Sequence, residues 1–485
     1  MSGADLKGKT RTGLYWTTLN QLSNYGIQFL IGIVMARLLS PEDFGISVLP
    51  AVFLAIAAVF IDCGFSSAMV RKPDLTEQDI STAFYYSLMV GVTCYVVIYC
   101  LSPWIAAFYQ VPILERLIRW AALSFLINPL TTPQTILLSR RLDFKTPTIV
   151  EMVSRIMMGI CGITMAYLGY GVWALIISTL VSNFMSLVLK TVVVRWYPKT
   201  GWSKTSFRYL WGYGNKLVAS YLIGNIYENI VPVIVGKFYS PALLGIYDRA
   251  QHYSKLIAVS STNIFQQVSF PVLSKIQEND QELRNGYRRI LKAAAFMTFP
   301  LMMLLAALAK PLVLLLLTEK WEGSVIFLQL MCFPMMWYPV HAINLNILQV
   351  KGRTDAFLKL EMLKRGFGVI ALAITLPIGL IAVVLSSWVT NIISLFLNTY
   401  YTQRIIHYSF IQQVSDLLPT LLLSIFMFGV VLSITCFIES YIVQIIAGSL
   451  IGFVIFSIGS ILFRFPEIQD LKYMLHIDIR AHEKI

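Results

Sequence analysis

The sequence predicts an all-α polytopic membrane protein with about fourteen transmembrane helices, arranged as two six-helix lobes followed by two C-terminal helices. The composition, a series of long apolar segments and an internal repeat predict this fold. Of the 485 residues, 57% are hydrophobic and 13% are charged, whereas soluble chains carry about 25% charged residues. The mean hydropathy of +0.70 agrees with a membrane protein.

The apolar segments have the length that a bilayer requires. A hydrocarbon core about 30 Å thick needs roughly 20 apolar residues per helix. Windows of that length give the predicted spans 13–37, 44–69, 81–109, 117–138, 148–170, 172–194, 213–237, 243–271, 293–318, 324–350, 361–381, 383–403, 415–438 and 441–463. Only short turns separate most of these spans, so neighbouring helices are expected to pack antiparallel.

The distribution of lysine and arginine predicts the orientation. With the N-terminus inside, the inner segments hold 28 of the 38 basic residues and the outer segments hold 6. Basic residues accumulate in cytoplasmic loops, so we expect both termini to be cytoplasmic. The first span follows a short basic segment without a cleavage site, which favours a retained helix over a signal peptide.

Charge and cysteine content exclude several classes of function. The net charge of +13 is explained by the inner loops, and no soluble domain remains to bind nucleic acid. The six cysteines form no C-x-x-C pair, and the five histidines show no metal-ligand spacing. We therefore expect no metal, no cofactor and no disulfide framework.

One motif occurs twice at a fixed offset. LLSPEDFGI and FYSPALLGI share S-P-x-x-x-G-I, at Ser40–Ile46 and Ser240–Ile246, and each copy follows a span on the outer side. Proline ends the first helix or begins the second, and glycine permits a close approach. We expect the motif to mark the phase of a duplication and to bind no ligand itself.

A second, weaker repetition supports the duplication. R-x-D follows the fourth span at Arg141 and the tenth span at Arg353. Six spans is an even number, so both copies would enter from the same side, which makes a parallel repeat. The predicted domains are an N-terminal lobe (1–200), a C-terminal lobe (201–410), and two extra helices with a cytoplasmic tail (411–485).

Polar residues within spans indicate which helices carry function, because an ionisable group in a bilayer costs at least about 2.5–3.5 kcal/mol. The seventh span places Lys216, Ser220, Gly224 and Glu228 on one face of a helix. The first span carries Asn20, Asn24 and Gln28 on the corresponding face. These two stripes lie 200 residues apart, as the motif does.

The eighth span is the most polar. Alternating steps of three and four residues, with Val259 in between, connect its polar positions, and Arg249 lies beside them. These positions are Asp248, His252, Lys255, Thr262, Gln266 and Ser269. At 1.5 Å per residue, Lys255 lies near the middle of the bilayer. Such a face must line a hydrated cavity or pack against polar groups.

Some of the charged groups have ordinary structural explanations. Glu151 and Arg155 in the fifth span have the spacing of an ion pair along a helix, and Lys216 lies near the inner surface, where a lysine can extend its ammonium to water. His252 has the pKa range of a proton carrier, although simple packing is the more ordinary role for it and for His341.

Together these positions predict a polar cavity with a cationic centre, lined mainly by spans one, two, seven and eight. Its predicted residues are Lys255, Arg249, Lys216, Arg155, Glu228, Asp248, Asp62, Asn20, Asn24, Gln28, His252 and Gln266. Shielded cations suit a phosphate-bearing substrate.

ARLLSPEDFGI after the first span and LLGIYDRAQ at the eighth resemble the polysaccharide transporter branch of the multidrug/oligosaccharidyl-lipid/polysaccharide exporter superfamily. Within that branch the chain is similar to Wzx-type flippases of lipopolysaccharide and colanic acid biosynthesis, along essentially its whole length. The resemblance implies transport by alternating access, without enzymatic catalysis, of undecaprenyl-diphosphate-linked oligosaccharide to the outer leaflet. It further implies substrate binding by cavity cations, with the direct match at Tyr247-Asp248-Arg249-Ala250.

The resemblance also implies partners and energy sources. They are a lipid-linked oligosaccharide, membrane lipids, a polysaccharide polymerase machinery, and an H⁺ or Na⁺ gradient for coupling. A monomer can contain the whole pathway.

Three other functions were weighed. A drug/cation antiporter of the same fold should have a site dominated by carboxylates and aromatics, but cations outnumber acids in the predicted cavity. A lipid II flippase is a related alternative that the residues do not separate. A membrane polymerase or ligase should carry a large catalytic outer loop, and the predicted outer loops are short.

Overall fold

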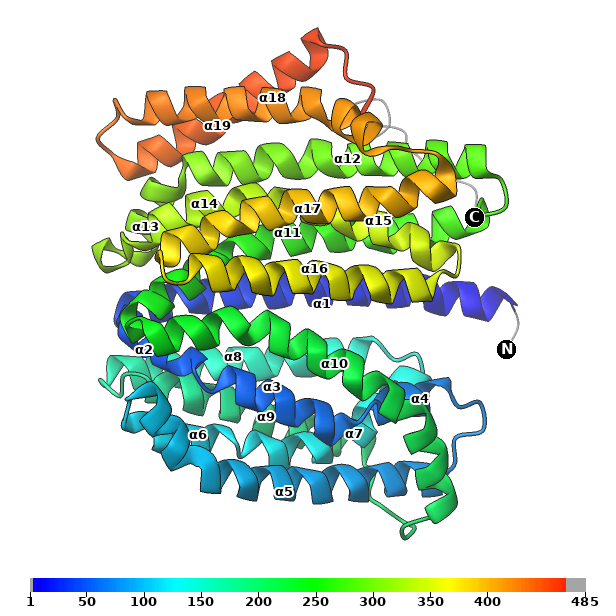
Figure 1. Cartoon of the computed structure of the whole chain (residues 1–485). Coiled ribbons are helices and arrows are strands. Elements are labelled where there is room, and N and C mark those ends of the chain that lie inside the picture. Colours follow the sequence, from blue (N-terminus) through cyan, green and yellow to red (C-terminus); the bar gives the residue numbers. More distant parts are fainter. Residues whose placement is uncertain (1–2, 468–485) are drawn as a thin grey trace. The chain divides into compact units, whose positions relative to one another are not determined.

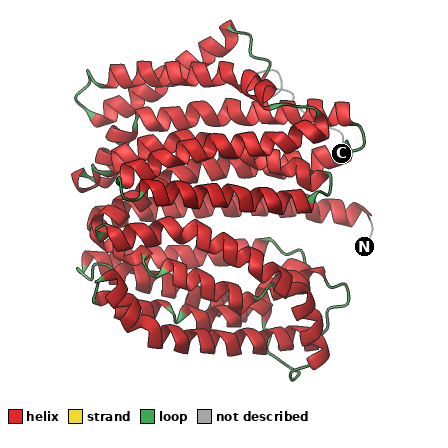
Figure 2. Ribbon diagram, viewed as in Figure 1, coloured by secondary structure: helices red, strands yellow, loops and turns green. Residues whose placement is uncertain are grey.

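The computed structural model describes the backbone of residues 3–467 and the side chains of 16–467 other than 216, 217, 267, 268 and 354. Within that part of the chain the regular structure is helical and contains no strand (Figure 2). Ten of its helices are long and apolar enough to cross a membrane. This confirms the predicted all-α polytopic fold, whereas the count of fourteen spans stays a prediction.

The chain forms two compact units, Met1–Asp248 and Arg249–Ile485. The helices of the first unit are α1 (Gly3–Leu38), α2 (Pro41–Val48), α3 (Ala51–Asp62), α4 (Phe65–Arg71), α5 (Glu77–Tyr109), α6 (Ile113–Ala121), α7 (Ser124–Arg140), α8 (Lys145–Tyr167), α9 (Trp173–Val194) and α10 (Lys204–Phe238). Helix α11 (Pro241–Lys275) begins in this unit and continues into the second. In the first unit α8 packs against both α1 and α9, and α7 packs against α5 and α9 (Figure 1).

The second unit contains the remaining helices. They are α12 (Asp280–Ala307), α13 (Ala309–Leu317), a 3₁₀ turn (Glu319–Trp321), α14 (Ser324–Met336), α15 (Tyr338–Val350), α16 (Thr354–Thr375), α17 (Leu380–Ile406), α18 (Phe410–Thr435) and α19 (Tyr441–Leu462). Helix α12 packs against α18, α16 against α17, and α18 against α19. The two C-terminal helices, orange and red in Figure 1, therefore pack onto this unit through α12.

A helix or a set of consecutive helices coincides with each predicted span, but several spans are interrupted. The second span is divided into α2, α3 and α4, and the interruption before α4 occurs where Cys63 and Gly64 have φ of 47° and 68°. The fourth, ninth and tenth spans are likewise formed by α6–α7, α12–α13 and α14–α15. Hydropathy predicts a span from each of these segments, but it does not predict where the backbone bends.

Local sequence explains where several helices begin. Ser40, Thr76 and Ser409 each form a capping box with the acidic or amide side chain three residues later. In such a box the hydroxyl accepts from one free backbone N–H and the later side chain accepts from another. The capping boxes fix the starts of α2, α5 and α18.

The two copies of S-P-x-x-x-G-I occupy equivalent positions and contact each other. In each copy a helix begins at the proline, and two residues separate it from the end of the preceding long helix. A Cβ at Gly45 would lie 1.7 Å from the carbonyl oxygen of Pro241, and a Cβ at Gly245 would lie 1.9 Å from that of Pro41. The glycines therefore permit a reciprocal backbone contact, so the motif does more than mark the phase of the repeat.

The first compact unit extends beyond residue 200 because α10 packs against α3, α4 and α5. A Cβ at Gly214 of α10 would lie 2.1 Å from the carbonyl oxygen of Cys63, at the interruption before α4. The predicted domain boundary at 200/201 follows the duplication rather than compactness, and it stays a prediction.

Candidate functional site

Helix α11 carries the cationic part of the predicted site. Ser240 precedes this helix as Ser40 precedes α2. Its hydroxyl accepts a hydrogen bond from the N–H of Leu243 at 3.2 Å. Lys255 is exposed, fourteen residues and therefore about 21 Å along the helix from Pro241. A charged side chain at that depth cannot face hydrocarbon without a large cost.

The other predicted residues of α11 are partly buried. Asp248, Arg249, His252 and Gln266 all have intermediate exposure, and the His252 ring packs edge-on against Tyr253 with centroids 5.6 Å apart. The hydroxyl of Thr262, by contrast, is buried and donates back to the carbonyl of Ala258 at 2.7 Å. The charged groups of this helix thus lie toward its first half.

Helix α10 supplies one exposed acid. Glu228 is exposed, while the neighbouring asparagines bond to their own helix: Asn225 donates to the carbonyl of Tyr221 at 2.9 Å and Asn229 to that of Asn225 at 2.8 Å. The side chain of Lys216 lies outside the described residues. Glu228 is therefore the acidic side chain that the structure describes in the seventh predicted span.

Helices α1 and α8 bring three polar residues together. Asn20 and Asn24 both donate to one carboxylate oxygen of Glu151, at 3.0 and 3.2 Å, and Asn24 also donates to Asn20 at 2.7 Å. Glu151 and Arg155 form no ion pair among the described residues, so the expected pair is replaced by this cluster. Arg155 and Gln28 are partly buried on the same two helices.

Lys190 is a buried cation that the sequence analysis assigned to an inner segment. Its side chain is 8% exposed on α9, its ammonium donates to the hydroxyl of Thr135 at 3.1 Å, and it lies close enough to Glu151 for their charges to attract. Beside it, Gln134 donates to Thr191 at 3.2 Å. A lysine one turn from the end of a span carries no sequence signal that distinguishes burial from exposure.

Asp62 lies at the interruption between α3 and α4. One of its oxygens accepts from the N–H of Gly64 at 3.1 Å, and the other accepts from the hydroxyl of Ser66. These contacts give Asp62 a structural role in starting α4, and its predicted role as a cavity counter-charge stays a prediction.

The second unit contains a buried polar network that the sequence analysis missed. Asn344 of α15 donates to Gln413 at 3.2 Å and accepts from Thr402 at 2.9 Å. Nearby, a ring nitrogen of the partly buried His341 lies 3.0 Å from the amide nitrogen of the buried Asn398. The network connects α15, α17 and α18, and its partners come from distant segments that no local pattern pairs.

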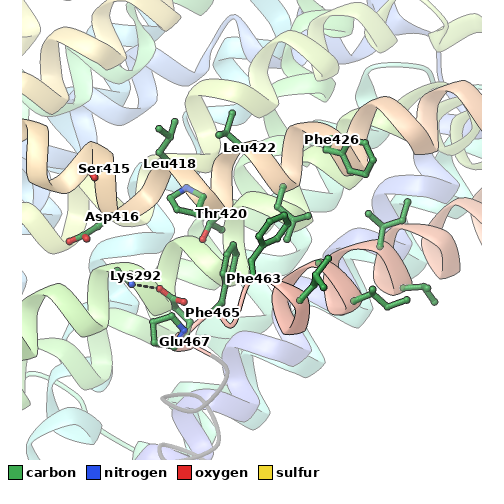
Figure 3. A pocket seen from close by; sticks show the side chains of 18 residues that line it. Lys292, Ser415, Asp416, Leu418, Thr420, Leu422, Phe426, Phe463, Phe465 and Glu467 are labelled. Atoms are coloured by element: carbon green, nitrogen blue, oxygen red, sulfur yellow. Dashed lines mark ion pairs between the residues drawn. The ribbon is translucent and has the colours of Figure 1, made fainter.

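A groove of about 1160 Å³ lies along α18 and α19 in the second unit (Figure 3). Apolar side chains form most of its wall, among them Leu418, Leu422, Phe426, Ile458, Phe463 and Phe465. One end is charged: Lys292 pairs with Glu467 at 2.6 Å, and both border the groove together with Asp416. The groove therefore combines a long apolar surface with a charged end.

The charged end is held by a further set of contacts. Arg288 donates twice to Asp416, at 2.5 Å each, and Tyr408 donates to the same carboxylate at 2.5 Å. Burial, together with this hydrogen bond, raises the pKa of Tyr408 above its usual range, so the phenol stays a donor. Bidentate arginine–carboxylate pairs fix geometry as well as charge.

Known proteins resemble this chain in sequence and in fold. A family model described as "Polysaccharide biosynthesis protein" matches residues 34–326. The teichuronic acid biosynthesis protein TuaB of Bacillus subtilis (strain 168) is 25% identical over 352 residues, covering 71% of this chain and 72% of that protein. The lipopolysaccharide biosynthesis protein WzxC of Escherichia coli (strain K12) is 22% identical over 366 residues, covering 74% and 73%.

Among solved structures, the inward closed conformation of the lipid II flippase MurJ is similar, with a TM-score of 0.72 and 17% identity. The match covers 92% of this chain and 99% of that one. At this identity the similarity establishes a common fold.

Proposed function

The chain belongs to the polysaccharide biosynthesis protein family, and on that premise we propose that it is a flippase for lipid-linked oligosaccharide. The substrate is an undecaprenyl-diphosphate-linked repeat unit of lipopolysaccharide or exopolysaccharide, moved across the cytoplasmic membrane by alternating access. Two relatives support this substrate class, because they are named as proteins of teichuronic acid and lipopolysaccharide biosynthesis.

The groove along α18 and α19 is the observation that carries the proposal. Its apolar wall matches a long polyprenyl chain, and its charged end matches the point where such a chain meets a polar headgroup. Within a bilayer, packing rather than the hydrophobic effect holds an apolar chain against a protein. A recessed surface supplies that packing, whereas a smooth helix face does not.

The cations of α11 supply the second part of the proposal. Lys255 and Arg249 bind the diphosphate, because phosphate oxygens accept charge-assisted hydrogen bonds from both side-chain types. Lys216 and Arg155 add positive charge, and Glu228, Asp248 and Asp62 act as counter-charges. Asn20, Asn24, Gln28, His252 and Gln266 provide neutral polar contacts for the glycan.

The remaining elements of the proposal concern the setting. The protein acts as a monomer in the bacterial cytoplasmic membrane, with both termini cytoplasmic, and delivers its product to a polysaccharide polymerase. It catalyses no covalent step and uses an H⁺ or Na⁺ gradient. The charge asymmetry of the loops supports the orientation.

Reconstitution with defined lipids tests the function. The full chain is placed in vesicles with a labelled undecaprenyl-diphosphate oligosaccharide, and headgroup exposure on the opposite face is measured. Lys255→Ala and Arg249→Ala should each lower the rate at least tenfold, while Lys275→Ala, at the end of the same helix, should not. Normal rates in the first two variants contradict the cationic site.

Alternative substrates complete the same experiment. Lipid II and an organic cation are offered in separate vesicles, and proton entry is followed with a pH-sensitive dye. Preferential transport of lipid II would move the substrate to peptidoglycan precursors. Transport of the cation alone would indicate an antiporter.

A further inference from the structure

The first unit contains a smaller cavity between α4 and α10. It has a volume of about 560 Å³ and is lined by Ala68, Arg71, Pro73, Tyr209, Gly212 and Tyr213. These residues come from the end of α4, the segment after it and the first part of α10. The volume falls within the range of about 300–1,000 Å³ found for small-molecule sites.

Arg71 is the charged group of this cavity. Its side chain is exposed, and its guanidinium carbon lies 5.2 Å from the centroid of the Tyr213 ring. A cation–π contact orients the guanidinium but leaves its charge and its in-plane donors available. Among the described residues, no carboxylate forms an ion pair with Arg71.

Two of the acids that follow it in sequence have other partners, and within the described part of the chain the third, Asp74, forms no ion pair with Arg71. Asp79 accepts from the ammonium of Lys72 at 2.6 Å, and Glu77 accepts from the indole N–H of Trp196 at 2.8 Å. Within the part of the chain that the structure describes, the ammonium of Lys72 therefore has an ion-pair partner, whereas the guanidinium of Arg71 has none. This difference makes Arg71 the anion-binding group of the pair.

The backbone that carries Arg71 is held in place. Arg140 of α7 donates to the carbonyls of Met69, Lys72 and Pro73, on both sides of Arg71. Three carbonyls bound to one guanidinium fix the segment relative to α7. The cavity is thus a preformed feature, which lowers the cost of ordering it around a ligand.

Exposed aromatic residues surround this end of α10. Trp202, Tyr209 and Trp211 are 46%, 47% and 42% exposed, and the Lys72 ammonium lies 4.8 Å from the Tyr209 ring centroid. Tryptophan and tyrosine gather where headgroups meet the hydrocarbon. The lysine and arginine distribution predicts that this end faces the cytoplasmic leaflet, which carries anionic lipids.

We propose that this cavity binds the phosphate of one anionic phospholipid headgroup, with Arg71 as the phosphate ligand and Tyr213 as the residue that orients it. Phosphate oxygens match the two parallel N–H groups of a guanidinium. A cavity half the volume of the groove accepts a single headgroup, whereas an oligosaccharide of several rings exceeds it. The site is separate from the proposed transport substrate.

Lipid binding to the purified full chain tests the proposal. Thermal unfolding in detergent is measured with added phosphatidylglycerol, with phosphatidylcholine and with inorganic phosphate. Phosphatidylglycerol should raise the Tm most, and Arg71→Ala should weaken its apparent affinity at least fivefold. Arg208→Ala removes an exposed arginine of α10 that does not line the cavity, and it should leave the affinity unchanged.

A second variant separates binding from folding. Gly212 has open space around a would-be Cβ, with nothing within 4 Å, so Gly212→Leu should fold normally while it fills the cavity and leaves Arg71 in place. It should lose phosphatidylglycerol binding as Arg71→Ala does.

The proposal is overturned if phosphatidylglycerol and phosphatidylcholine stabilise equally, if binding is unchanged in both variants, or if inorganic phosphate alone gives the full stabilisation. Tighter Arg71-dependent binding of undecaprenyl phosphate than of phosphatidylglycerol assigns the site to the transported lipid instead and refutes the phospholipid. This assay requires no transport, so its outcome is independent of the proposed function.

Discussion

Replacing Gly45 with alanine should separate the two copies of S-P-x-x-x-G-I. The added Cβ would lie 1.7 Å from the carbonyl oxygen of Pro241, and real Cβ contacts do not fall below 3.0 Å. The backbones must therefore move apart by about 1.3 Å. Both partners are backbone atoms at helix starts, so no flexible side chain can absorb the change.

The energy follows from the size of this movement. Overpacking of a close contact costs typically about 1–3 kcal/mol. Gly245→Ala, whose Cβ would lie 1.9 Å from Pro41, should cost a similar amount. Since either variant separates the same two backbones, the second substitution has less left to displace. The double variant should therefore cost clearly less than the sum of the single variants.

Thermal unfolding of the four proteins in detergent measures this coupling. Gly32→Ala on α1 is the matched control, because its Cβ would meet nothing within 4 Å. That substitution should be neutral or stabilising, as alanine favours a helix over glycine. If Gly45→Ala behaves like Gly32→Ala, or if the two motif variants are additive, the reciprocal contact does not exist as described.

Two further predictions concern the charged clusters of each unit. Glu151→Ala should lower the Tm, because Asn20 and Asn24 lose a shared acceptor and Lys190 loses a counter-charge, at a cost of about 1–3 kcal/mol. Glu151→Gln should retain part of the stability. Equal Tm values for wild type and Glu151→Ala would contradict the cluster. Lys292→Ala should destabilise the second unit, because Glu467 is 3% exposed and loses its ion-pair partner. Adding Glu467→Gln to this variant should restore part of the lost Tm. Purely additive losses would show that the two residues are not coupled.

The sequence was sufficient to predict the class of fold and the approximate helices, because hydropathy over about 20 residues depends only on consecutive residues. The helix starts at Ser40, Thr76 and Ser409 are also local, since each depends on a side chain three residues later. Within the residues that the structure describes, spans one and eight are not among the ten helices apolar enough to cross a membrane, yet they form the long helices α1 and α11.

The candidate site was predictable in part. The polar positions of α1, α10 and α11 could be identified from spacing, but their partners could not. Glu151 has the spacing to pair with Arg155, yet its carboxylate accepts from Asn20 and Asn24, more than 120 residues away. The charge distribution assigns Lys190 to the basic residues of an inner segment, but packing against α7 buries its side chain.

By itself the sequence determined that this chain spans a membrane and where S-P-x-x-x-G-I recurs. Only the tertiary structure decided that the two copies of this motif contact each other, that within its described part Lys72 has an ion-pair partner while Arg71 has none, and that α18 and α19 form a groove. Hydropathy and capping are properties of neighbouring residues. The choice of partners across 200 residues depends on how backbones approach and which acids are already paired, and these exist only once the helices have packed.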